Sequence, residues 1–203
     1  IIKETQTNKI KIGYKFGLEF FNSKNGRKFI SKIKNKILFI DLKLCDIPNT
    51  CVATIKSIKD LKINYLTIHI SSGLDALKAS KKVSGKTKLI GVTTLTSLDN
   101  KNLKQIGYNK NLKELAIHQA KLAAKANLDG LVCSAHEVKY VKKNFKKEII
   151  TPGIRLNSNI NDQKRIMGPK QAFKNGSNWL VVGRAITKGS IKNNIKKLIK
   201  NIS

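Results

Sequence analysis

The sequence has few aromatic residues, no long apolar run and no signal-peptide pattern, and each shortage excludes a class of protein. Aromatic residues make up 6% of the chain, and no motif for stacking on nucleic-acid bases is visible. No apolar run approaches the roughly 18–20 residues that are needed to span a bilayer. The first residues lack the charged and apolar regions of a secretory leader. We therefore expect a cytoplasmic protein that has no membrane partner.

Motifs for metals and cofactors are also missing. The three cysteines, Cys45, Cys51 and Cys133, form neither a CxxC pair nor a Cys/His ligand spacing. Two of them fall in expected core elements, where reduced thiols of a cytoplasmic protein are the usual state. The sequence has no GxGxxG, no P-loop and no clustered metal-ligand spacing. Nothing in it therefore requires a cofactor or a metal.

Acidic residues are scarce relative to basic ones. The chain has 41 Lys and Arg against 12 Asp and Glu, which gives a formal net charge of +29. Such an excess can indicate nucleic-acid binding. The lysines, however, are spread over nearly every expected helix. We interpret them as a basic surface that has no specific nucleic-acid partner but that would attract a phosphorylated substrate.

The chain does contain enough apolar residues for a core, in a regular alternation of strand-like and helix-like segments. Hydrophobic residues make up 40% of the 203 residues, which suits one folded domain of ordinary α/β size. Most expected strands are short continuous apolar runs, typical of parallel strands covered on both faces. We expect strands at 10–13, 37–41, 65–70, 88–93, 130–133, 149–151 and 179–182. We expect helices at 26–35, 50–61, 74–82, 111–126, 136–145, 169–175 and 191–200.

Repeated β/α units without an internal linker predict an α/β fold of the TIM-type (β/α)8 barrel class, in a single domain over residues 1–203. The seven expected strands are one fewer than a closed barrel has. Residues Ile1–Asn8 look like the end of a helix. We therefore expect that the barrel lacks its first β/α unit.

The most informative stretch is the apolar run Ile37–Ile40 and the charged residues that follow it. Asp41 and Lys43 are two residues apart, so on an extended strand both side chains point to the same face. Because burying an unpaired charge is costly, we expect the two to pair. A second acid, Asp46, precedes Pro48, which ends the strand and leads into a helix. Charges at the C-terminal end of a strand lie on the catalytic face of a β/α barrel.

The spacing Asp-x-Lys-x-x-Asp with the continuation Ile-Pro-Asn-Thr, from Asp41 to Thr50, resembles the signature of bacterial orotidine 5′-phosphate decarboxylases. Other stretches resemble this family in the same order along the chain. They are Ile10–Gly13, His69–Gly73, Leu95–Ser97, Thr151–Arg155 and Val182–Arg184. The resemblance implies a first strand, ending in an Asp that contacts the ribose, before the start of this sequence. From the size of one β/α unit, we expect about 20–30 residues to be missing.

The resemblance further implies decarboxylation of orotidine 5′-monophosphate to UMP in pyrimidine biosynthesis, without a cofactor. Lys43 would stabilise the carbanion at C6 and protonate it. Asp41 would lie against the departing carboxylate and hold Lys43. The family's lysine at the end of the second barrel strand falls on Lys11. The expected array of alternating charges is therefore Lys11, Asp41, Lys43 and Asp46.

The resemblance also implies a homodimer with shared active sites. Asp46 and Thr50 would serve the neighbouring subunit's site, and Thr96 would contact the pyrimidine. The remaining substrate-binding positions would hold the phosphate and remote parts of the nucleotide. They are Arg155, Gln163, Gly183 and Arg184.

Two alternatives stay open. Metal-dependent sugar-phosphate decarboxylases and aldolases of the same superfamily share the Asp-x-Lys-x-x-Asp spacing. The Ile-Pro-Asn-Thr continuation and the Leu-Thr-Ser motif favour the nucleotide enzyme. The other alternative is an inactive, basic RNA-binding remnant, which would bind RNA tightly, with steep salt dependence and without turnover.

Overall fold

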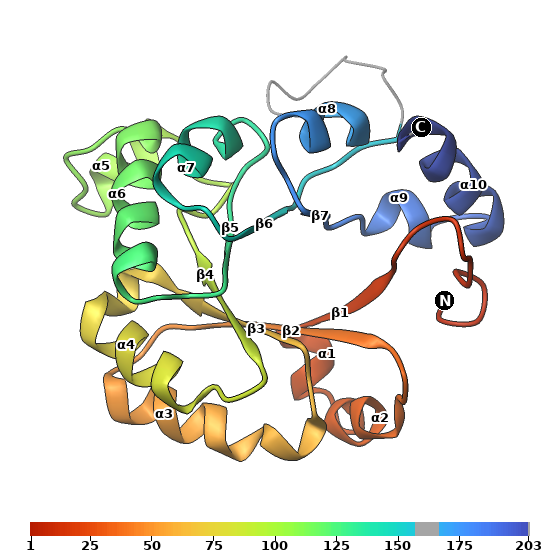
Figure 1. Ribbon diagram of the computed structural model, residues 1–203, viewed down its shortest axis with the longest axis horizontal. Helices are drawn as coiled ribbons and strands as arrows, with labels where there is room; N and C mark the ends of the chain where they lie inside the picture. Colours follow the sequence, from red (N-terminus) through yellow and green to blue (C-terminus); the bar gives the residue numbers. More distant parts are fainter. Residues whose placement is uncertain (157–166, 203) are drawn as a thin grey trace. The chain divides into compact units, whose positions relative to one another are not determined.

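The computed structural model describes residues 1–156 and 167–202 and confirms the alternation of strands and helices (Figure 1). The strands form one sheet, in which they follow one another in sequence order. The strand pairs of defined register are parallel. The strands are β1 (Gly13–Gly17), β2 (Ile37–Leu44), β3 (Tyr65–His69), β4 (Lys88–Val92), β5 (Gly130–Val132), β6 (Glu148–Thr151) and β7 (Trp179–Leu180).

Helices follow the strands along the described chain. Those that the sequence predicts are α2 (Gly26–Lys32), α3 (Pro48–Ser57), α4 (Gly73–Val83), α6 (Leu112–Lys125), α7 (Val138–Asn144), α8 (Pro169–Lys174) and α10 (Ile191–Ile202). The sequence pattern does not predict α1 (Leu18–Asn22), α5 (Asn100–Gln105) and α9 (Arg184–Thr187). These helices have six residues or fewer, too few for apolar periodicity to be recognised. Single 3-10 turns lie at Lys59–Leu61 and Ile70–Ser72.

Contacts divide the chain into two compact units, each made of separate segments. The first, here called the β1–β4 unit, comprises Gly13–Thr93 and His118–Leu131. The second, the β6–β7 unit, comprises Ile1–Ile12, Thr94–Ile117 and Val132–Ser203. Strand β5 begins in the first unit and ends in the second. A single domain over the whole chain stays a prediction.

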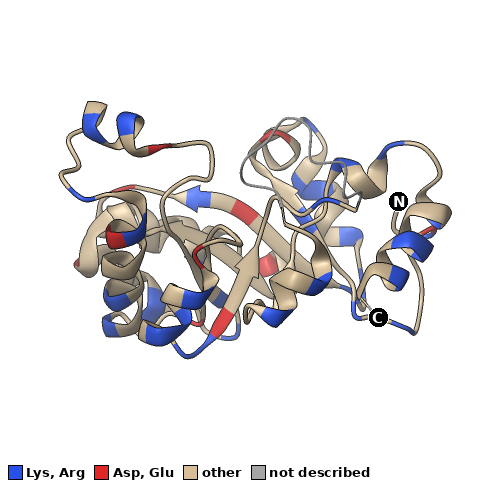
Figure 2. Cartoon of the chain, turned by 90° about the horizontal axis from the view of Figure 1, so that it is seen from above, with Lys and Arg blue, Asp and Glu red and all other residues tan. Residues whose placement is uncertain are grey.

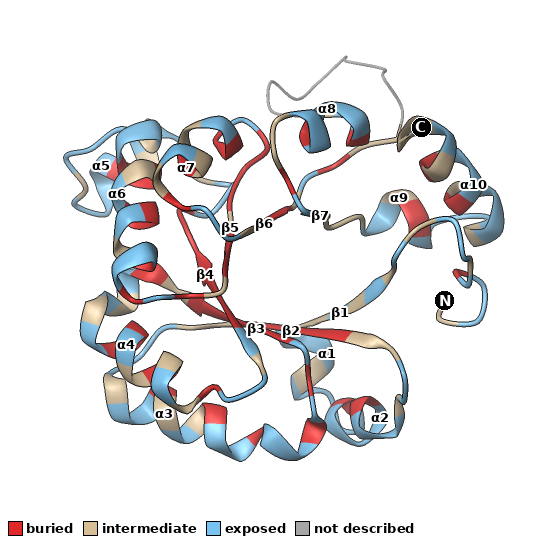
Figure 3. Cartoon of the chain, in the orientation of Figure 1, coloured by how far each residue is buried: buried red, intermediate tan, exposed pale blue. Residues whose placement is uncertain are grey.

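Buried parallel strands form the core of the β1–β4 unit. Residues Leu38–Asp41 of β2, Tyr65–Ile68 of β3 and Leu89–Val92 of β4 are buried (Figure 3). Helices α3 and α4 lie side by side and bury one face each. At Gly91 of β4 there is no room for a side chain, because a Cβ atom there would lie 2.5 Å from the Cδ1 atom of Ile70. The apolar runs thus form strands covered on both faces, as predicted.

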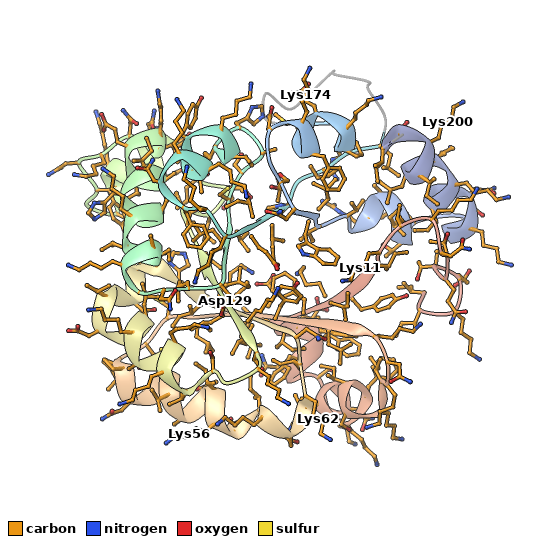
Figure 4. All side chains as sticks on the ribbon, in the orientation of Figure 1. Lys11, Lys56, Lys62, Asp129, Lys174 and Lys200 are labelled. Atoms are coloured by element: carbon orange, nitrogen blue, oxygen red, sulfur yellow. The ribbon has the colours of Figure 1, made fainter. Side chains whose placement is uncertain are left out.

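Asp129, labelled in Figure 4, joins a strand of the β1–β4 unit to a helix of the same unit. Its Oδ2 atom accepts a hydrogen bond from the backbone N–H of Leu89 at 2.8 Å. The ammonium group of Lys81 on α4 lies 2.8 and 2.6 Å from the two carboxylate oxygens. The acid therefore satisfies a backbone donor at the start of β4 and fixes the end of α4 beside it.

In the β6–β7 unit, hydrogen bonds join β6 to the loop that precedes β7. Asn178 accepts a hydrogen bond from the backbone N–H of Ile149 at 2.8 Å, and the hydroxyl groups of Thr151 and Ser177 lie 2.6 Å apart. The helix α10 presents an apolar face to a small buried cluster. Its members come from α9, α10 and the segments before β1 and after β7, and include Ile10, Ile12, Val182, Ile186, Ile195 and Leu198.

This cluster corrects the first predicted strand. The sequence predicts a strand at Ile10–Gly13, whereas β1 spans Gly13–Gly17. The alternation of apolar residues continues from Ile10 to Phe16, so the pattern alone does not tell which part joins the sheet. In the structure Ile10 and Ile12 pack against the α10 cluster, and β1 pairs with β2 from Gly13 onward.

The basic residues are distributed over the surface of both units (Figure 2). Lys56 on α3, Lys174 on α8 and Lys200 on α10 are exposed and extend away from their helices (Figure 4). This agrees with the interpretation that the lysines form a solvated surface. Within the described residues, no helix is both long enough and apolar enough to cross a membrane.

Candidate active site

The Asp-x-Lys triplet lies where the pairing of β2 with β3 is irregular. Ile40 pairs with Leu66 and Leu44 pairs with Ile68, so three residues of β2 lie opposite Thr67 alone. Extra residues on one strand of a pair form a β-bulge, which bends the strand and redirects its side chains. The charged triplet of the motif is therefore itself the bulge.

Lys43 takes an uncommon backbone conformation within this bulge. Its φ angle is +48°, in the left-handed region that side chains with a Cβ atom rarely adopt. Its backbone N–H donates a hydrogen bond to the Oγ1 atom of Thr67 at 2.7 Å. Its Nζ atom lies 3.0 Å from Oδ1 of Asp41. The predicted pairing of Asp41 and Lys43 is thus confirmed, although the bulge brings them together rather than a regular strand.

The carboxylate of Asp41 is held from both sides. It is 8% exposed. The Oδ2 atom accepts a hydrogen bond from Nζ of Lys15 at 2.8 Å, and Oδ1 accepts one from Oγ1 of Thr67 at 3.0 Å. The two lysine side chains stay 33% and 35% exposed, so their ammonium groups remain accessible to a ligand. An acid between two bases gives the site, here called the Lys15–Asp41–Lys43 array, a net positive charge.

Two pKa values in the site depart from their ordinary range. Burial by itself raises the pKa of Asp41, but hydrogen bonds and charges from Lys15 and then Lys43 outweigh it, and the pKa is lowered. Burial, and secondarily the charge of Lys43, lower the pKa of His69. The Nδ1 atom of His69 accepts a hydrogen bond from the backbone N–H of Ser71 at 3.3 Å. We conclude that Asp41 is ionised and His69 neutral near pH 7.

The structure corrects the predicted role of Lys11. Because β1 begins at Gly13, the lysine that pairs with Asp41 is Lys15, in the sequence Lys15-Phe16-Gly17. Lys11 lies before the strand, with its Nζ atom 5.8 Å from the centre of the Trp179 ring. Two Lys-x-Gly triplets occur in succession here, and the family resemblance pointed to the first.

Thr67 is a site residue that the sequence analysis does not find. It is completely buried in β3 and contacts both members of the Asp-x-Lys motif. The signal that could have found it is a single polar residue within the apolar run Tyr65–Ile68. A threonine is common enough in strands that this signal is weak.

Asp46 and Thr50 lie beyond the end of β2. Asp46 is exposed, and its Oδ1 atom accepts a hydrogen bond from the backbone N–H of Ile47 at 2.7 Å. Thr50 is exposed in the first turn of α3, which begins at Pro48. Among the ion pairs of the described residues, none joins Asp46 to the Lys15–Asp41–Lys43 array. Their predicted place in a neighbouring subunit's site stays a prediction.

The predicted base- and phosphate-binding residues belong to the β6–β7 unit. Thr96 is exposed in the loop after β4. Arg155 follows the isolated bridge between Ile154 and Met167, and its side chain is half-buried. Gly183 precedes α9, and Arg184 is its exposed first residue. Gln163 lies outside the described residues.

Metal-ligand groups do not gather in the described part of the chain. No set of three or more His, Cys, Asp and Glu side chains there could hold a metal ion. The chemistry that the described array offers is electrostatic and acid–base: an ionised carboxylate beside two ammonium groups, one of which can donate a proton.

A parallel α/β fold with Asp-x-Lys at the C-terminal end of a strand defines a class of β/α-barrel enzymes. The sequence model described as the orotidine 5′-phosphate decarboxylase / HUMPS family matches residues 5–196. The chain therefore belongs to this family.

Curated relatives agree with the match. The chain is 45% identical over 182 residues to an orotidine 5′-phosphate decarboxylase of Wolbachia pipientis, covering 87% of this chain and 80% of the relative. A Wolbachia enzyme of the same name from Brugia malayi is 42% identical over 210 residues, covering 100% of this chain and 93% of the relative. The enzyme of that name from Ehrlichia chaffeensis is 44% identical, over 87% of this chain and 79% of the relative.

Solved structures confirm the predicted fold class. An orotidine 5′-phosphate decarboxylase from Lactobacillus acidophilus superposes with a TM-score of 0.81 at 31% identity, over 93% of this chain and 86% of that one. The enzyme from Methanocaldococcus jannaschii, at 24% identity, shows the same fold with a TM-score of 0.77, over 100% of this chain and 91% of that one. The fold is that of the TIM-type barrel.

The charge array predicts how acid affects stability. Because the folded-state pKa of Asp41 lies below its ordinary value of 3.8, Asp41 stabilises the fold above that pH. The stabilisation is lost as the pH falls through the folded value. Replacing Lys15 by Met removes one of the charges that lower the pKa. We expect the acid unfolding of Lys15→Met, followed by circular dichroism, to begin at higher pH than in the wild type.

Lys11→Met is the matched control, because it removes the same charge from a lysine that pairs with a tryptophan ring. Its acid unfolding is expected to follow the wild type. Equal shifts in both variants would show that net charge, and not the contact with Asp41, determines the acid limit.

Proposed function

We propose that this chain decarboxylates orotidine 5′-monophosphate to UMP and CO₂. The observation that carries the proposal is the ammonium group of Lys43, held 3.0 Å from an Asp41 carboxylate that Lys15 binds on its other oxygen. The membership of the family and the shared name of relatives at 42–45% identity support it. The family description names HUMPS as well as orotidine 5′-phosphate decarboxylase. The names of the curated relatives favour the decarboxylase.

The reaction needs stabilisation of negative charge on carbon. When CO₂ leaves C6 of the pyrimidine, the electron pair of the broken bond stays on that carbon. In our proposal the Lys43 ammonium stabilises this pair and then transfers a proton to C6, which gives UMP. Because Asp41 fixes the ammonium before the reaction, little reorganisation is needed as the charge develops. Lys15 keeps Asp41 ionised and in place.

Asp41 has a second proposed role. Its ionised carboxylate would lie against the carboxylate of the substrate, and two like charges at close range repel each other. The repulsion is relieved when CO₂, which is neutral, departs. The interaction would therefore favour the transition state over the bound substrate, as catalysis requires.

We further propose that residues of the β6–β7 unit bind the rest of the nucleotide. Thr96 would contact the pyrimidine, and Arg155, Gln163 and Gly183 would contact the phosphate and ribose side. Arg184 is exposed, and its guanidinium offers a planar pair of donors that suits phosphate oxygens. Binding energy from these remote contacts could lower the barrier at C6.

The first test of the mechanism is Lys43→Ala. Loss of the proton donor should nearly abolish turnover of orotidine 5′-monophosphate, measured by the change in absorbance of the pyrimidine. Lys62→Ala is the matched control, because Lys62 is an exposed lysine with the same φ of +48°. A Lys43→Ala enzyme that keeps more than about a tenth of the wild-type rate, an effect under about 1.4 kcal/mol, would contradict the role. Wild-type turnover that EDTA abolishes would instead favour a metal-dependent member of the superfamily.

If Arg184 binds the phosphate, the effect of replacing it on KM and kcat/KM should depend on whether the substrate carries a phosphate. Arg184→Ala should raise KM strongly and lower kcat/KM for the nucleotide. The loss should nearly vanish for orotidine, the nucleoside that lacks the phosphate. The exposed Lys174→Ala serves as the control for removal of a surface cation from the same unit. If Arg184→Ala weakens turnover of both substrates equally, Arg184 does not bind the phosphate.

We propose, finally, that two copies of the chain share their active sites. Asp46 and Thr50 are exposed after the end of β2, Asp46 just before Pro48 and Thr50 just after it. A two-fold dimer would carry two composite sites, each completed by the partner. Activity would then fall on dilution below the dissociation constant of the dimer.

Mixing two inactive variants tests the shared site. In a mixed dimer of Lys43→Ala and Asp46→Ala, one site carries both lesions and the other carries neither. Random exchange makes about half of the dimers mixed, so roughly a quarter of the wild-type activity should return. If exchange of subunits is demonstrated with labelled chains and no activity returns, Asp46 acts within its own subunit.

A further inference from the structure

We propose that Thr67 is a positioning residue for the decarboxylation: its hydroxyl holds the Asp41 carboxylate and the backbone of Lys43 in their working arrangement. The proposal deepens the function proposed above and rests on it. Thr67 lies opposite three residues of β2, and these three include both charged members of the motif. Thr67 is the one residue of β3 between the paired residues Leu66 and Ile68. The regular strand pairing is therefore interrupted opposite Asp41 and Lys43.

The hydrogen bonds give the hydroxyl a fixed polarity. An ionised carboxylate only accepts, so the Thr67 O–H donates to Oδ1 of Asp41, at 3.0 Å. The backbone N–H of Lys43 only donates, so the same oxygen accepts from it, at 2.7 Å. The proton of this hydroxyl is thus donated to Asp41, and one lone pair accepts the N–H of Lys43. A side chain with the same shape but no oxygen would break both contacts at once.

The contact with Lys43 holds a backbone that would otherwise relax. A non-glycine residue with positive φ is strained and persists where its surroundings fix it. At Lys43, with φ of +48°, the hydrogen bond to Thr67 is such a constraint. This conformation directs the side chain of Lys43 back toward Asp41. Thr67 therefore acts on the proton donor through its main chain.

The contact with Asp41 fixes the other member of the pair. The Oδ1 atom receives the Thr67 hydroxyl and the Lys43 ammonium, and Oδ2 receives Lys15 from β1. His69 on β3 is a further titratable group near Lys43; burial, and secondarily the charge of Lys43, lower its pKa. Without the hydroxyl, Asp41 would keep its ion pairs but lose the donor that sets its orientation. Thr67 is fully buried, so contact with solvent does not account for a polar side chain at this position.

The test compares Thr67→Val, which keeps the shape and loses the oxygen, with Thr67→Ser, which keeps the oxygen. Thr151→Val is the matched control. It removes a hydroxyl from a fully buried strand threonine whose hydrogen bond, to Ser177 at 2.6 Å, lies outside the array. Each variant is assayed at a temperature where circular dichroism shows it folded. Thr67→Ala replaces Thr67→Val should the latter not fold.

We expect Thr67→Val to lower kcat roughly tenfold to a hundredfold, since small displacements of reacting groups have effects of this size. KM should change by less than about threefold, because the substrate's binding groups are untouched. Thr67→Ser and Thr151→Val should keep near-wild-type kcat. A folded Thr67→Val enzyme with wild-type kcat, or a Thr67→Ser enzyme as slow as Thr67→Val, would overturn the proposal.

A second readout does not depend on turnover. The pKa of Asp41, followed by ¹³C NMR of its carboxyl carbon, should rise in Thr67→Val, stay near the wild-type value in Thr67→Ser and not move in Thr151→Val. If the wild-type chain does not decarboxylate orotidine 5′-monophosphate, the proposed function fails. The NMR titration still decides whether Thr67 holds Asp41, and an unchanged pKa in Thr67→Val would refute it.

Discussion

The buried carboxylate of Asp41 is the constraint on which the rest of the candidate site depends. A charged side chain that is 11% exposed is strongly unfavourable unless it is paired, and removing one partner of such a pair leaves the other uncompensated. Lys15 and Lys43 supply the pairing from two neighbouring strands, and Thr67 supplies a neutral donor from a third. Strands β1, β2 and β3 must therefore be in register for all three contacts to form together. The site is a property of the sheet and not of one motif.

Much of the fold follows from the sequence because the signals are local. Short apolar runs between helical patterns predict six of the strands to within a few residues, and the cost of burying Asp41 unpaired predicts its pairing with Lys43. Strand β1 is different, because the apolar alternation from Ile10 to Phe16 is longer than the strand. The choice between Lys11 and Lys15 depends on whether Ile10 and Ile12 pack against the sheet or against α10. That is a tertiary contact, which periodicity cannot reveal.

The bulge and Thr67 could not be predicted for a related reason. Nothing in the residue types from Asp41 to Lys43 requires a left-handed lysine, and β-bulges without glycine have no strong sequence pattern. The arrangement becomes visible only when β3 is placed beside β2 and three residues are found opposite one. The contacts of Thr67 with Asp41 and Lys43 then explain why one polar residue lies in the apolar run Tyr65–Ile68. Family resemblance identified Asp41 and Lys43, whereas geometry was needed to find Lys15 and the neutral Thr67 that contact them.

The left-handed backbone of Lys43 has a consequence for how this protein can change over time. Glycine or asparagine adopts this conformation with less strain than lysine does. Replacing a buried ion pair by uncharged residues is, moreover, often neutral or stabilising. Selection for heat resistance alone would therefore favour an uncharged position 41 and a glycine at position 43. In the proposed mechanism, it is turnover that requires lysine at this position. In barrels of this family that have lost the reaction but kept the fold, this position should be among the first to diverge.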